Sequence, residues 1–365
     1  MNDTQKYMER AIRLAGKGAG WVNPNPLVGA VVVKDNVIIG EGYHQYFGGP
    51  HAEVNAIAAC TADPAGATLY VTLEPCTHTG KTPPCTQLIL EKHIAKVIIG
   101  MSDPNPLVNG KGIELLRNSG VEVESGVLEH KIRRQNEVFI KYITTGMPFV
   151  VLKSAMTLDG KTASVTRASR WITGETSRKM VHRMRAQYSA VMTGINTVIQ
   201  DDPLLNVRLK KKQSHQPLRI ILDSTLKISR EAKVIQTEPL LSVIATTHHA
   251  DPEKIQMLER IGVHVIVCPE DNGQVSLEYL VKALGAMEID SVMIEGGSTL
   301  AFSAIRTGIV DKLVTFIAPR ILGGEKAPTP VGGAGIEHPD AAVELVDMEV
   351  KKAGKDLCVE AWIKK

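Results

Sequence analysis

The sequence predicts an α/β protein made of two domains. Strand-like apolar runs alternate with helical patterns in both halves of the chain, which is typical of sheets covered by helices. The chain of 365 residues is long enough for two domains with complete cores. Gly146-Met147-Pro148 interrupts the pattern, so we expect the domains at residues 1–146 and 147–365.

The first half begins with an amphipathic helix, because Tyr7, Met8, Ile12 and Leu14 recur at helical spacing before a glycine-rich stretch. A branched apolar run at 28–33 predicts a buried strand, which a hairpin turn joins to a strand at 37–40. The rest of this half predicts a βαβ alternation. We expect strands at 69–73, 96–100 and 121–124, and helices at 51–60, 86–92, 112–118 and 129–144.

The second half repeats strands and helices in a way that indicates a parallel, helix-covered sheet. Its last two strands alternate well enough for an antiparallel pair, and a stretch rich in proline and glycine at 327–340 predicts a surface loop. We expect strands at 149–152, 190–193, 218–223, 242–245, 263–267, 291–294, 311–318, 343–350 and 357–363, and helices at 174–187, 252–261 and 277–287.

The composition argues against a protein that binds polyanions or crosses a membrane. Positive and negative charges balance in residues 1–146, so the excess of +3 lies in the remainder. Lys210-Lys211-Lys212 is the longest basic run and predicts a solvated loop. No apolar run approaches the length of a membrane span. We therefore expect small-molecule substrates, without nucleic acid or membrane as partners.

The cysteines and the N-terminus predict a cytoplasmic protein. Five irregularly spaced cysteines do not form a disulfide framework. Cys60, Cys268 and Cys358 lie in apolar contexts and are expected to be core thiols. The N-terminal residues contain no apolar segment of a secretory signal.

The clearest chemical pattern is His51-Ala52-Glu53 followed by Pro75-Cys76 and Cys85. One imidazole and two thiolates, with a water in the fourth position, make an open tetrahedral zinc site. Glu53 is expected to shuttle protons. His-x-Glu followed by Pro-Cys and a further cysteine is typical of zinc deaminases of nucleobases. Eight residues separate the two cysteines here, against two in the general pattern.

Two other readings of these residues stay open. Cys76 and Cys85 fit buried thiols, and a closed structural zinc would take His78 as its fourth ligand. The loop composition around both cysteines favours the catalytic zinc. His44 and Lys81 flank the pattern and are candidates for substrate contact, although exposed loop residues would look the same.

These motifs resemble the family of bifunctional riboflavin biosynthesis enzymes, and the likeness extends over essentially the whole chain. The long interval between Cys76 and Cys85 is usual in that family. The matching segments are Asn25-Pro26-Leu27-Val28-Gly29, His51-Ala52-Glu53, Thr72-Leu73-Glu74-Pro75-Cys76, Lys81-Thr82-Pro83-Pro84-Cys85, Asp103-Pro104-Asn105-Pro106 and Gly110-Lys111-Gly112.

The resemblance implies both a fold and two activities. The N-terminal domain would be a cytidine-deaminase-like three-layer domain with one zinc ion, and the C-terminal domain would resemble dihydrofolate reductase. The family removes the amino group from a diaminopyrimidinone ribosylamine 5′-phosphate and then reduces the ribose to ribitol with NADPH. On this match His51, Cys76 and Cys85 are zinc ligands and Glu53 is the proton shuttle. Asn25, His44 and Lys81 fall where the family contacts its pyrimidine substrate.

In the second half, Glu295-Gly296-Gly297-Ser298 closes a strand and opens a helix. Glycines at such a turn let a phosphate approach the helix N-terminus, although a Gly-Gly turn is often only a structural break. No Gly-x-Gly-x-x-Gly motif is present, so an ordinary Rossmann dinucleotide site is not predicted. The choice of NADPH therefore rests on the resemblance.

The resemblance also assigns residues of the second half, through Leu158-Asp159-Gly160, Trp171-Ile172-Thr173, Asp201-Asp202-Pro203 and Glu295-Gly296-Gly297. The positions that match NADPH contacts are Ala155, Trp171, Thr197, Asp201, Gly297, Ser298, Thr299, Leu300, Ala301, Phe302 and Ser303. The positions that match substrate contacts are Ser169, Arg185, Leu205, Arg208 and Glu295.

Physical chemistry supports some of these roles and leaves alternatives for others. The guanidinium groups of Arg185 and Arg208 suit a ribose 5′-phosphate, although surface salt bridges would use the same residues. Asp201 suits a ribose hydroxyl, and it equally suits a turn. Lys153, expected at a strand end, is a candidate to polarise the opened sugar, with an outward-facing strand lysine as the alternative.

Three hypotheses remain from the sequence. The first is the bifunctional deaminase and reductase, which we expect to form a homo-oligomer, a dimer or a tetramer, through exposed apolar strands of the second half. The second is a zinc deaminase of nucleic-acid bases, which the balanced charge disfavours. The third is a nucleotide sensor with a structural zinc. Glu53 distinguishes the third hypothesis from the two enzymatic ones, because only an enzyme needs a residue that transfers protons.

Overall fold

The computed structural model of the chain describes residues 2–77, 83–105, 108–209 and 215–364. The chain divides into two compact units, Met1–Gly146 and Met147–Lys365. Within the described residues, no helix is both long and apolar enough to cross a lipid bilayer. Lys210-Lys211-Lys212, predicted as a solvated loop, lies outside the described residues.

The first unit is built on a mixed five-stranded sheet with the order β2-β1-β3-β4-β5. Strand β1 pairs antiparallel with both β2 and β3, and the strands from β3 to β5 run parallel. Asp35 and Asn36 form the hairpin turn with φ of 49° and 62°, as a type I′ turn requires. The strands are β1 (Gly29–Lys34), β2 (Val37–Tyr43), β3 (Thr68–Leu73), β4 (Lys96–Met101) and β5 (Glu122–Ser125).

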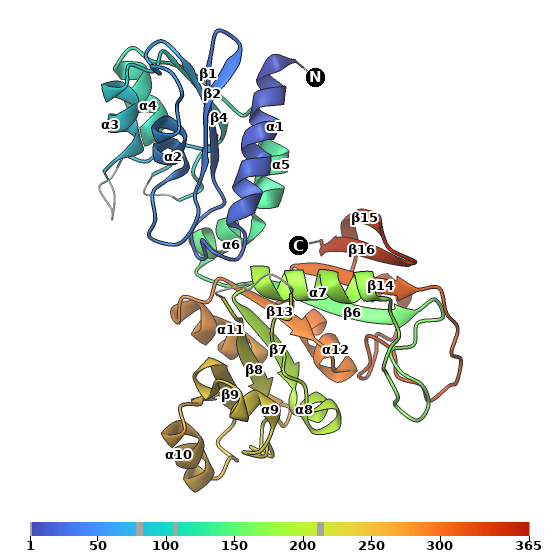
Figure 1. Ribbon diagram of the computed structural model, residues 1–365. Coiled ribbons are helices and arrows are strands. Elements are labelled where there is room, and N and C mark those ends of the chain that lie inside the picture. Colours follow the sequence, from blue (N-terminus) through green and yellow to red (C-terminus); the bar gives the residue numbers. More distant parts are fainter. Residues whose placement is uncertain (1, 78–82, 106–107, 210–214, 365) are drawn as a thin grey trace. The chain divides into compact units, whose positions relative to one another are not determined.

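Helices cover both faces of this sheet, so the unit has three layers (Figure 1). Glycines on the strands let two helices approach closely. A Cβ on Gly29 would lie 2.1 Å from the carbonyl oxygen of Ala11 in α1, and one on Gly42 would lie 2.3 Å from the amide nitrogen of Ala56 in α2. The helices are α1 (Asp3–Ala15), α2 (Ala52–Ala58), α3 (Cys85–Glu91), α4 (Lys111–Asn118), α5 (Glu129–Gln135) and α6 (Glu137–Thr145), with a 3₁₀ turn η1 (Gly16–Gly18).

The helix predicted at 129–144 is wrong in one respect, because the structure divides it into α5 and α6 at Asn136. Asn136 has φ of −104° and ψ of 19°, outside the helical range. Its side chain accepts a hydrogen bond from the amide of Leu27 at 2.8 Å and donates one to the carbonyl of Leu27 at 3.1 Å. These long-range bonds compete with helix continuation, and no local periodicity signals them.

The second unit is built on a nine-stranded sheet with the order β10-β9-β8-β7-β13-β6-β14-β16-β15. Its strands pair parallel except at the β14–β16 and β16–β15 pairs, so the predicted antiparallel pair at the C-terminus is confirmed. The strands are β6 (Phe149–Thr157), β7 (Ala190–Gly194), β8 (Leu218–Leu222), β9 (Ser242–Thr246), β10 (His264–Val267), β13 (Ser291–Glu295), β14 (Lys312–Ala318), β15 (Leu345–Ala353) and β16 (Asp356–Ile363), beside the small hairpin β11 (Glu270–Asp271) and β12 (Gln274–Val275).

Alternating residues of these strands feed two cores on opposite faces of the sheet. Ala190 and Met192 of β7 join a core with α11 and α12, whereas Val191 joins a core with α8, α9 and α10. The helices are α7 (Glu175–Gln187), α8 (Ile195–Asp201), α9 (Lys233–Gln236), α10 (Pro252–Arg260), α11 (Leu277–Ala286) and α12 (Ser298–Arg306), with 3₁₀ turns η2 (Pro239–Leu241) and η3 (Pro339–Ala341). The predicted parallel sheet covered by helices is confirmed.

One local prediction in this unit is wrong, and helix α8 was not predicted. The strand predicted at 149–152 continues to Thr157, so Lys153 lies inside β6 and not at its end, because β14 pairs with β6 up to that residue. Residues 195–201, for which no element was predicted, form α8, and Val198 packs into the core on that face. Both differences arise from tertiary pairing, which the local sequence does not encode.

Candidate active sites

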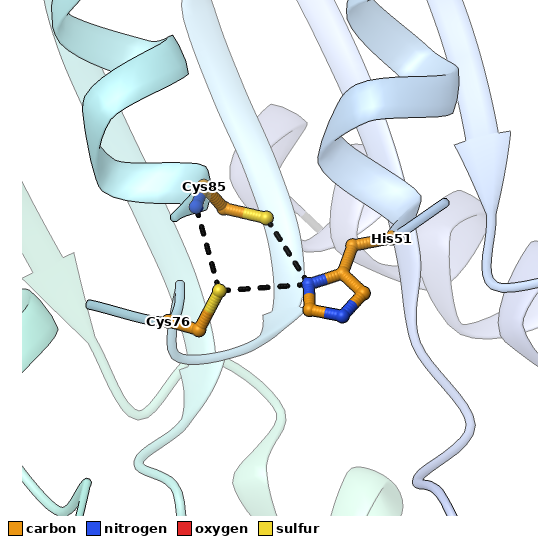
Figure 2. Close-up of side chains that lie close together, drawn as sticks. All are labelled: His51, Cys76 and Cys85. Atoms are coloured by element: carbon orange, nitrogen blue, oxygen red, sulfur yellow. Dashed lines mark hydrogen bonds between the residues drawn. The ribbon is translucent and has the colours of Figure 1, made fainter. Parts of the chain in front are cut away.

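His51, Cys76 and Cys85 bring three metal-ligating atoms together in the first unit (Figure 2). His51 precedes the first residue of α2, Cys85 is the first residue of α3, and Cys76 follows the end of β3. The His51 Nδ1 atom lies 3.3 Å from Cys85 Sγ and 3.5 Å from Cys76 Sγ. The Cys85 amide donates a hydrogen bond to Cys76 Sγ at 3.4 Å. The segment after β3 and the N-terminal ends of α2 and α3 thus form a compact candidate metal site.

The donor set fits zinc. An imidazole nitrogen and two sulfurs are the ligands of structural and catalytic zinc, and the four positions of a tetrahedron leave one open. A hydrogen bond with the Cys85 thiol, and then His51, lower the pKa of Cys76 below its ordinary value against the opposing effect of burial, while the same bond between the thiols raises the pKa of Cys85. A thiol with a low pKa readily forms the thiolate that binds metals. His78, the alternative fourth ligand, lies outside the described residues.

Glu53 lies beside this cluster in a pocket of about 220 Å³. Its side chain is buried, and burial raises the pKa of its carboxyl group to about 7. Carboxyl and metal-ligating side chains therefore face one cavity, as hydrolytic proton transfer requires. The other lining residues are Asn25, Pro26, Val28, His44, Ala52, Leu73, Glu74, Asp103, Asn105, Val108, Phe139 and Ile143.

Asn25 and His44, two of the predicted substrate contacts, touch each other in this pocket. The Nδ1 atom of buried His44 donates to the carbonyl of Pro50 at 3.1 Å, which leaves Nε2 to accept from Asn25 Nδ2 at 3.2 Å. Burial lowers the pKa of His44, which favours this neutral tautomer. The Asn25 amide is thereby fixed in orientation. Lys81, the third predicted contact, lies outside the described residues.

Glu74 is a buried pocket residue whose role the sequence reasoning missed. Its two carboxylate oxygens accept hydrogen bonds from the backbone amides of Asp103, Gly110, Gly112 and Ile113 at 2.8–3.3 Å. A Cβ on Gly112 would lie 2.1 Å from the carbonyl oxygen of Pro75, so only glycine fits there. The carboxylate thus ties the segment at 103–113 to the strand end that carries Cys76. Its position directly before Pro75-Cys76 was the available signal.

In the second unit, Glu295 at the end of β13 brings two predicted residues together. Its carboxylate accepts two hydrogen bonds from Arg185, at 2.6 and 3.0 Å, and pairs with the Lys153 ammonium at 2.9 Å. Burial would raise the pKa of Glu295, but the charges of Lys153 and Arg185 outweigh it and hold that pKa well below its usual range. Arg185 therefore forms a salt bridge, as the predicted alternative states, but a buried one, because its side chain is only 12% exposed.

Arg208, another predicted substrate contact, lies near this group. Its backbone amide donates to His182 Nδ1 at 3.3 Å, and its guanidinium donates to the side chain of Asn206 at 2.9 Å. Arg185 donates to the carbonyl of the same Asn206 at 3.0 Å. Burial and the two arginines lower the pKa of His182 to about 4. The arrangement concentrates positive charge, which suits a phosphate group.

A glycine turn connects the end of β13 to the start of α12, beside β7. Gly296 and Gly297 have φ of 74° and 80°, and a Cβ on Gly296 would lie 3.4 Å from Thr197 Oγ1. Among the described residues, the buried Thr193 Oγ1 has no hydrogen-bond partner. An open glycine turn and a helix N-terminus at the carboxyl edge of a parallel sheet fit the phosphates of a dinucleotide. The residues present are therefore compatible with NADPH.

The remaining residues predicted to contact the cofactor differ in the solvent exposure of their side chains. Ala155 lies in β6 opposite Phe316, and the Trp171 side chain is 59% exposed with the Arg178 guanidinium 4.4 Å from its ring centroid. Asp201 accepts a hydrogen bond from Arg170 through its carbonyl. In α12 the side chains of Leu300 and Ala301 pack into the core, while Ser298, Thr299, Phe302 and Ser303 are more exposed.

Two predicted substrate contacts lie outside the Glu295 cluster itself. Leu205 has a buried side chain in the core on the α8 face, so only its backbone is available for a ligand. Ser169 lies in the loop before Trp171, where its carbonyl accepts from the amide of Ile172. Of the three expected core thiols, Cys268 and Cys358 are buried and Cys60 is half-buried.

Two family models match the chain in the same order as the two units. The model of the cytidine and deoxycytidylate deaminase zinc-binding region matches residues 1–101. The model of the RibD C-terminal domain matches residues 148–359. The predicted fold class, a cytidine-deaminase-like domain followed by a reductase domain, is confirmed.

Relatives match over nearly their whole length. The chain is 48% identical to riboflavin biosynthesis protein RibD of Actinobacillus pleuropneumoniae, over 97% of this chain and 94% of that protein. It is 44% identical to RibD of Aquifex aeolicus, over 97% of each protein.

Solved structures agree with these sequence matches. RibD of Acinetobacter baumannii superposes with a TM-score of 0.88 at 37% identity, covering 100% of this chain and 99% of that one. The diaminohydroxyphosphoribosylaminopyrimidine deaminase/5-amino-6-(5-phosphoribosylamino)uracil reductase of Thermotoga maritima has a TM-score of 0.83 at 40% identity, covering 99% of both chains. The family predicted from the motifs is confirmed, and zinc and NADPH are the cofactors of that family. The chain belongs to the RibD family of bifunctional riboflavin biosynthesis enzymes.

Proposed function

We propose that this chain catalyses two successive reactions of riboflavin biosynthesis, with residues 1–146 as the deaminase and residues 147–365 as the reductase. The substrate of the first is a diaminopyrimidinone ribosylamine 5′-phosphate, and the second reduces the ribosyl group of the deaminated product with NADPH. The observation that carries the proposal is the cluster of His51, Cys76 and Cys85 at the pocket that also holds the buried Glu53.

In the deaminase unit, His51, Cys76 and Cys85 would hold the zinc ion, which supplies an acidified water when it is bound. Glu53 accepts a proton on its carboxylate and delivers protons to the ring nitrogen and the departing ammonia. Asn25, oriented by His44, contacts the pyrimidine. Lys81 joins this set on the family resemblance alone.

In the reductase unit, NADPH supplies the hydride. The turn at Gly296 and Gly297 and the start of α12 would hold the phosphates of NADPH, and Ala155, Trp171, Thr197 and Asp201 would make further contacts. The ribosylamine must open at C1′ before hydride transfer, and the protein's task is to hold the two reactants in line.

The charged residues of this unit bind the substrate. Arg185 and Arg208 bind the ribose 5′-phosphate, together with Ser169 and the backbone at Leu205. Glu295 holds Arg185 and Lys153 in position, and the Lys153 ammonium polarises the opened sugar.

A coupled assay on the full chain tests this assignment. The zinc-loaded protein is given the diaminopyrimidinone ribosylamine phosphate, and ammonia release is followed together with NADPH oxidation. A zinc chelator should stop ammonia release but spare reduction of supplied deaminated product. This result would establish two separate sites on one chain.

Other outcomes reassign parts of the chain. Ammonia release without NADPH oxidation would leave the deaminase standing and overturn the reductase. Absence of both signals with zinc present would overturn the substrate, and free nucleosides would be tested next. Chelation that stops both reactions equally would contradict separate sites.

We propose that the chain forms a homo-oligomer, a dimer or a tetramer, through β15. This nine-residue edge strand has a single buried residue, Ala353. Leu345, Met348 and Val350 are 46%, 67% and 56% exposed. An edge strand with exposed apolar side chains suits an antiparallel contact with a second copy. Light scattering on a M348K variant should show the monomer, whereas K355Q, in the neighbouring turn, should leave the assembly unchanged.

We propose a cytoplasmic location. All five cysteines, each within the described residues, are free thiols, and the proposed zinc site needs reduced cysteines. Fractionation of cells that produce the chain tests this. Recovery in a secreted or membrane fraction would contradict it.

A further inference from the structure

We propose that α6 supplies a wall of the deaminase pocket, formed by Phe139 and Ile143, on which the planar heteroaromatic ring of the substrate lies. We further propose that Asn136 positions this wall. The inference rests on the proposed function of the first unit and adds recognition residues to it. None of these three residues belongs to the set predicted from the sequence motifs.

The pocket is lined by both polar and apolar residues. Its polar groups include Asn25, His44 and Glu53, which suit the exocyclic groups and ring nitrogens of an aminopyrimidine. Phe139 and Ile143 contribute apolar surface to the same cavity. A flat ring with polar edges needs both kinds of contact, because its edges are hydrogen-bonded and its faces are apolar.

The geometry of α6 explains why these two residues face the cavity together. Phe139 and Ile143 are four residues apart, so they lie on one face of the helix. Ile140, next to that face, packs against the core of the first unit and anchors the helix. No residue of α6 is fully buried, so the core does not use up its apolar face.

Asn136 fixes the start of α6 relative to the loop that carries Asn25. Asn136 is 2% exposed, and its side-chain oxygen accepts from the Leu27 amide at 2.8 Å while its side-chain nitrogen donates to the Leu27 carbonyl at 3.1 Å. Leu27 is two residues from Asn25, which lines the pocket. One buried side chain therefore joins the start of α6 to the loop that carries Asn25.

The wall has a physical consequence for binding. Stacking of a base on an aromatic side chain contributes enough that alanine substitution weakens binding by about tenfold. An apolar wall also excludes water from the neighbourhood of Glu53, which strengthens the polar contacts inside the pocket. We therefore expect α6 to act on substrate affinity.

The test measures deamination by the full-length, zinc-loaded chain. F139A should raise KM for the aminopyrimidine substrate about tenfold and I143A by a few-fold, because less contact area is lost. V138A truncates the same helix outside the pocket lining and serves as the matched control. Zinc content and the rate of reduction of supplied deaminated product should be unchanged in all three variants.

Equilibrium binding separates affinity from turnover. In an E53Q background, which retains substrate, F139A should weaken the Kd for the substrate by the same factor as it raises KM. Equal affinities of the F139A and V138A proteins would overturn the wall. Loss of zinc from F139A would also overturn this role, because Phe139 would then stabilise the metal site and not contact the substrate. Absence of deamination in the unsubstituted protein would instead overturn the proposed function.

A double-mutant cycle tests Asn136 as a positioning residue. N136A should raise KM with a smaller effect on kcat, and N136D, which keeps the acceptor for the Leu27 amide, should restore part of the affinity. If Asn136 acts through Phe139, N136A should have little effect on KM in the F139A background. Additive effects on KM, or an effect of N136A on unfolding alone, would overturn this role.

Discussion

Glu295 and Arg185 form a buried two-point ion pair, with their oxygen and nitrogen atoms 2.6 and 3.0 Å apart. The two side chains are only 8% and 12% exposed, so water screens the pair weakly. Lys153 pairs with the same carboxylate at 2.9 Å, which leaves one anion between two cations. Loss of the anion therefore leaves two buried positive charges without compensation.

The variant E295Q should destabilise the second unit by about 3–5 kcal/mol, because breaking a buried pair leaves uncompensated charge in a low-dielectric site. Thermal unfolding of the full chain measures this change. E349Q removes an exposed partner of Lys351 and should change stability by less than about 0.5 kcal/mol. Equal unfolding midpoints for the two variants would contradict the buried pair.

The same pair predicts a pH dependence. The pKa of Glu295 lies below its ordinary value of 4.5 in the folded chain, because Lys153 and Arg185 outweigh the effect of burial. A lowered pKa stabilises the folded state above the ordinary value, and this contribution is lost as the pH falls through that value toward the lowered one. The stability difference between the unsubstituted chain and E295Q should be constant above about pH 6 and should shrink below about pH 5. A difference that grows toward acid pH would reverse the assigned sign.

The variants C76S and C85S should each lose the zinc ion, because a hydroxyl group is a poor substitute for a thiolate ligand. Deamination should fall to background, whereas reduction of supplied deaminated product should continue. Metal analysis of the purified chain provides the direct measurement. C60S changes a half-buried thiol outside the cluster and should keep its zinc, and metal retention in C76S would exclude Cys76 as a ligand.

The variant E74Q should weaken the first unit without removing zinc. The carboxylate accepts four backbone hydrogen bonds, and an amide replaces one accepting oxygen with a donor. Loss of charge-assisted hydrogen bonds predicts destabilisation of about 1.5–3 kcal/mol, measured by denaturant unfolding. Deamination should also fall, since the segment at 103–113 contributes Asp103 and Asn105 to the pocket. E114Q, on the exposed face of α4, is the control, and matching results for both variants would count against the role of Glu74.

The metal cluster shows that a sequence can predict which distant residues lie together in the folded chain. His51, Cys76 and Cys85 were recognisable because zinc restricts ligand type and spacing, and the structure brings their donor atoms within 4.8 Å of one another. The helices and strands at 28–33, 69–73 and 252–261 were recognisable for a similar reason, since burial imposes a periodicity on the chain.

The sequence by itself determined the two α/β halves, the family and the residue types of both candidate sites. The tertiary structure alone decided the break at Asn136, the position of Lys153 inside β6 and the placement of Phe139 on the pocket. Each of these depends on a partner distant in sequence: the backbone of Leu27, strand β14 and the cavity beside Glu53. Local propensity and periodicity describe only neighbouring residues, so contacts of this kind appear only when the chain is folded.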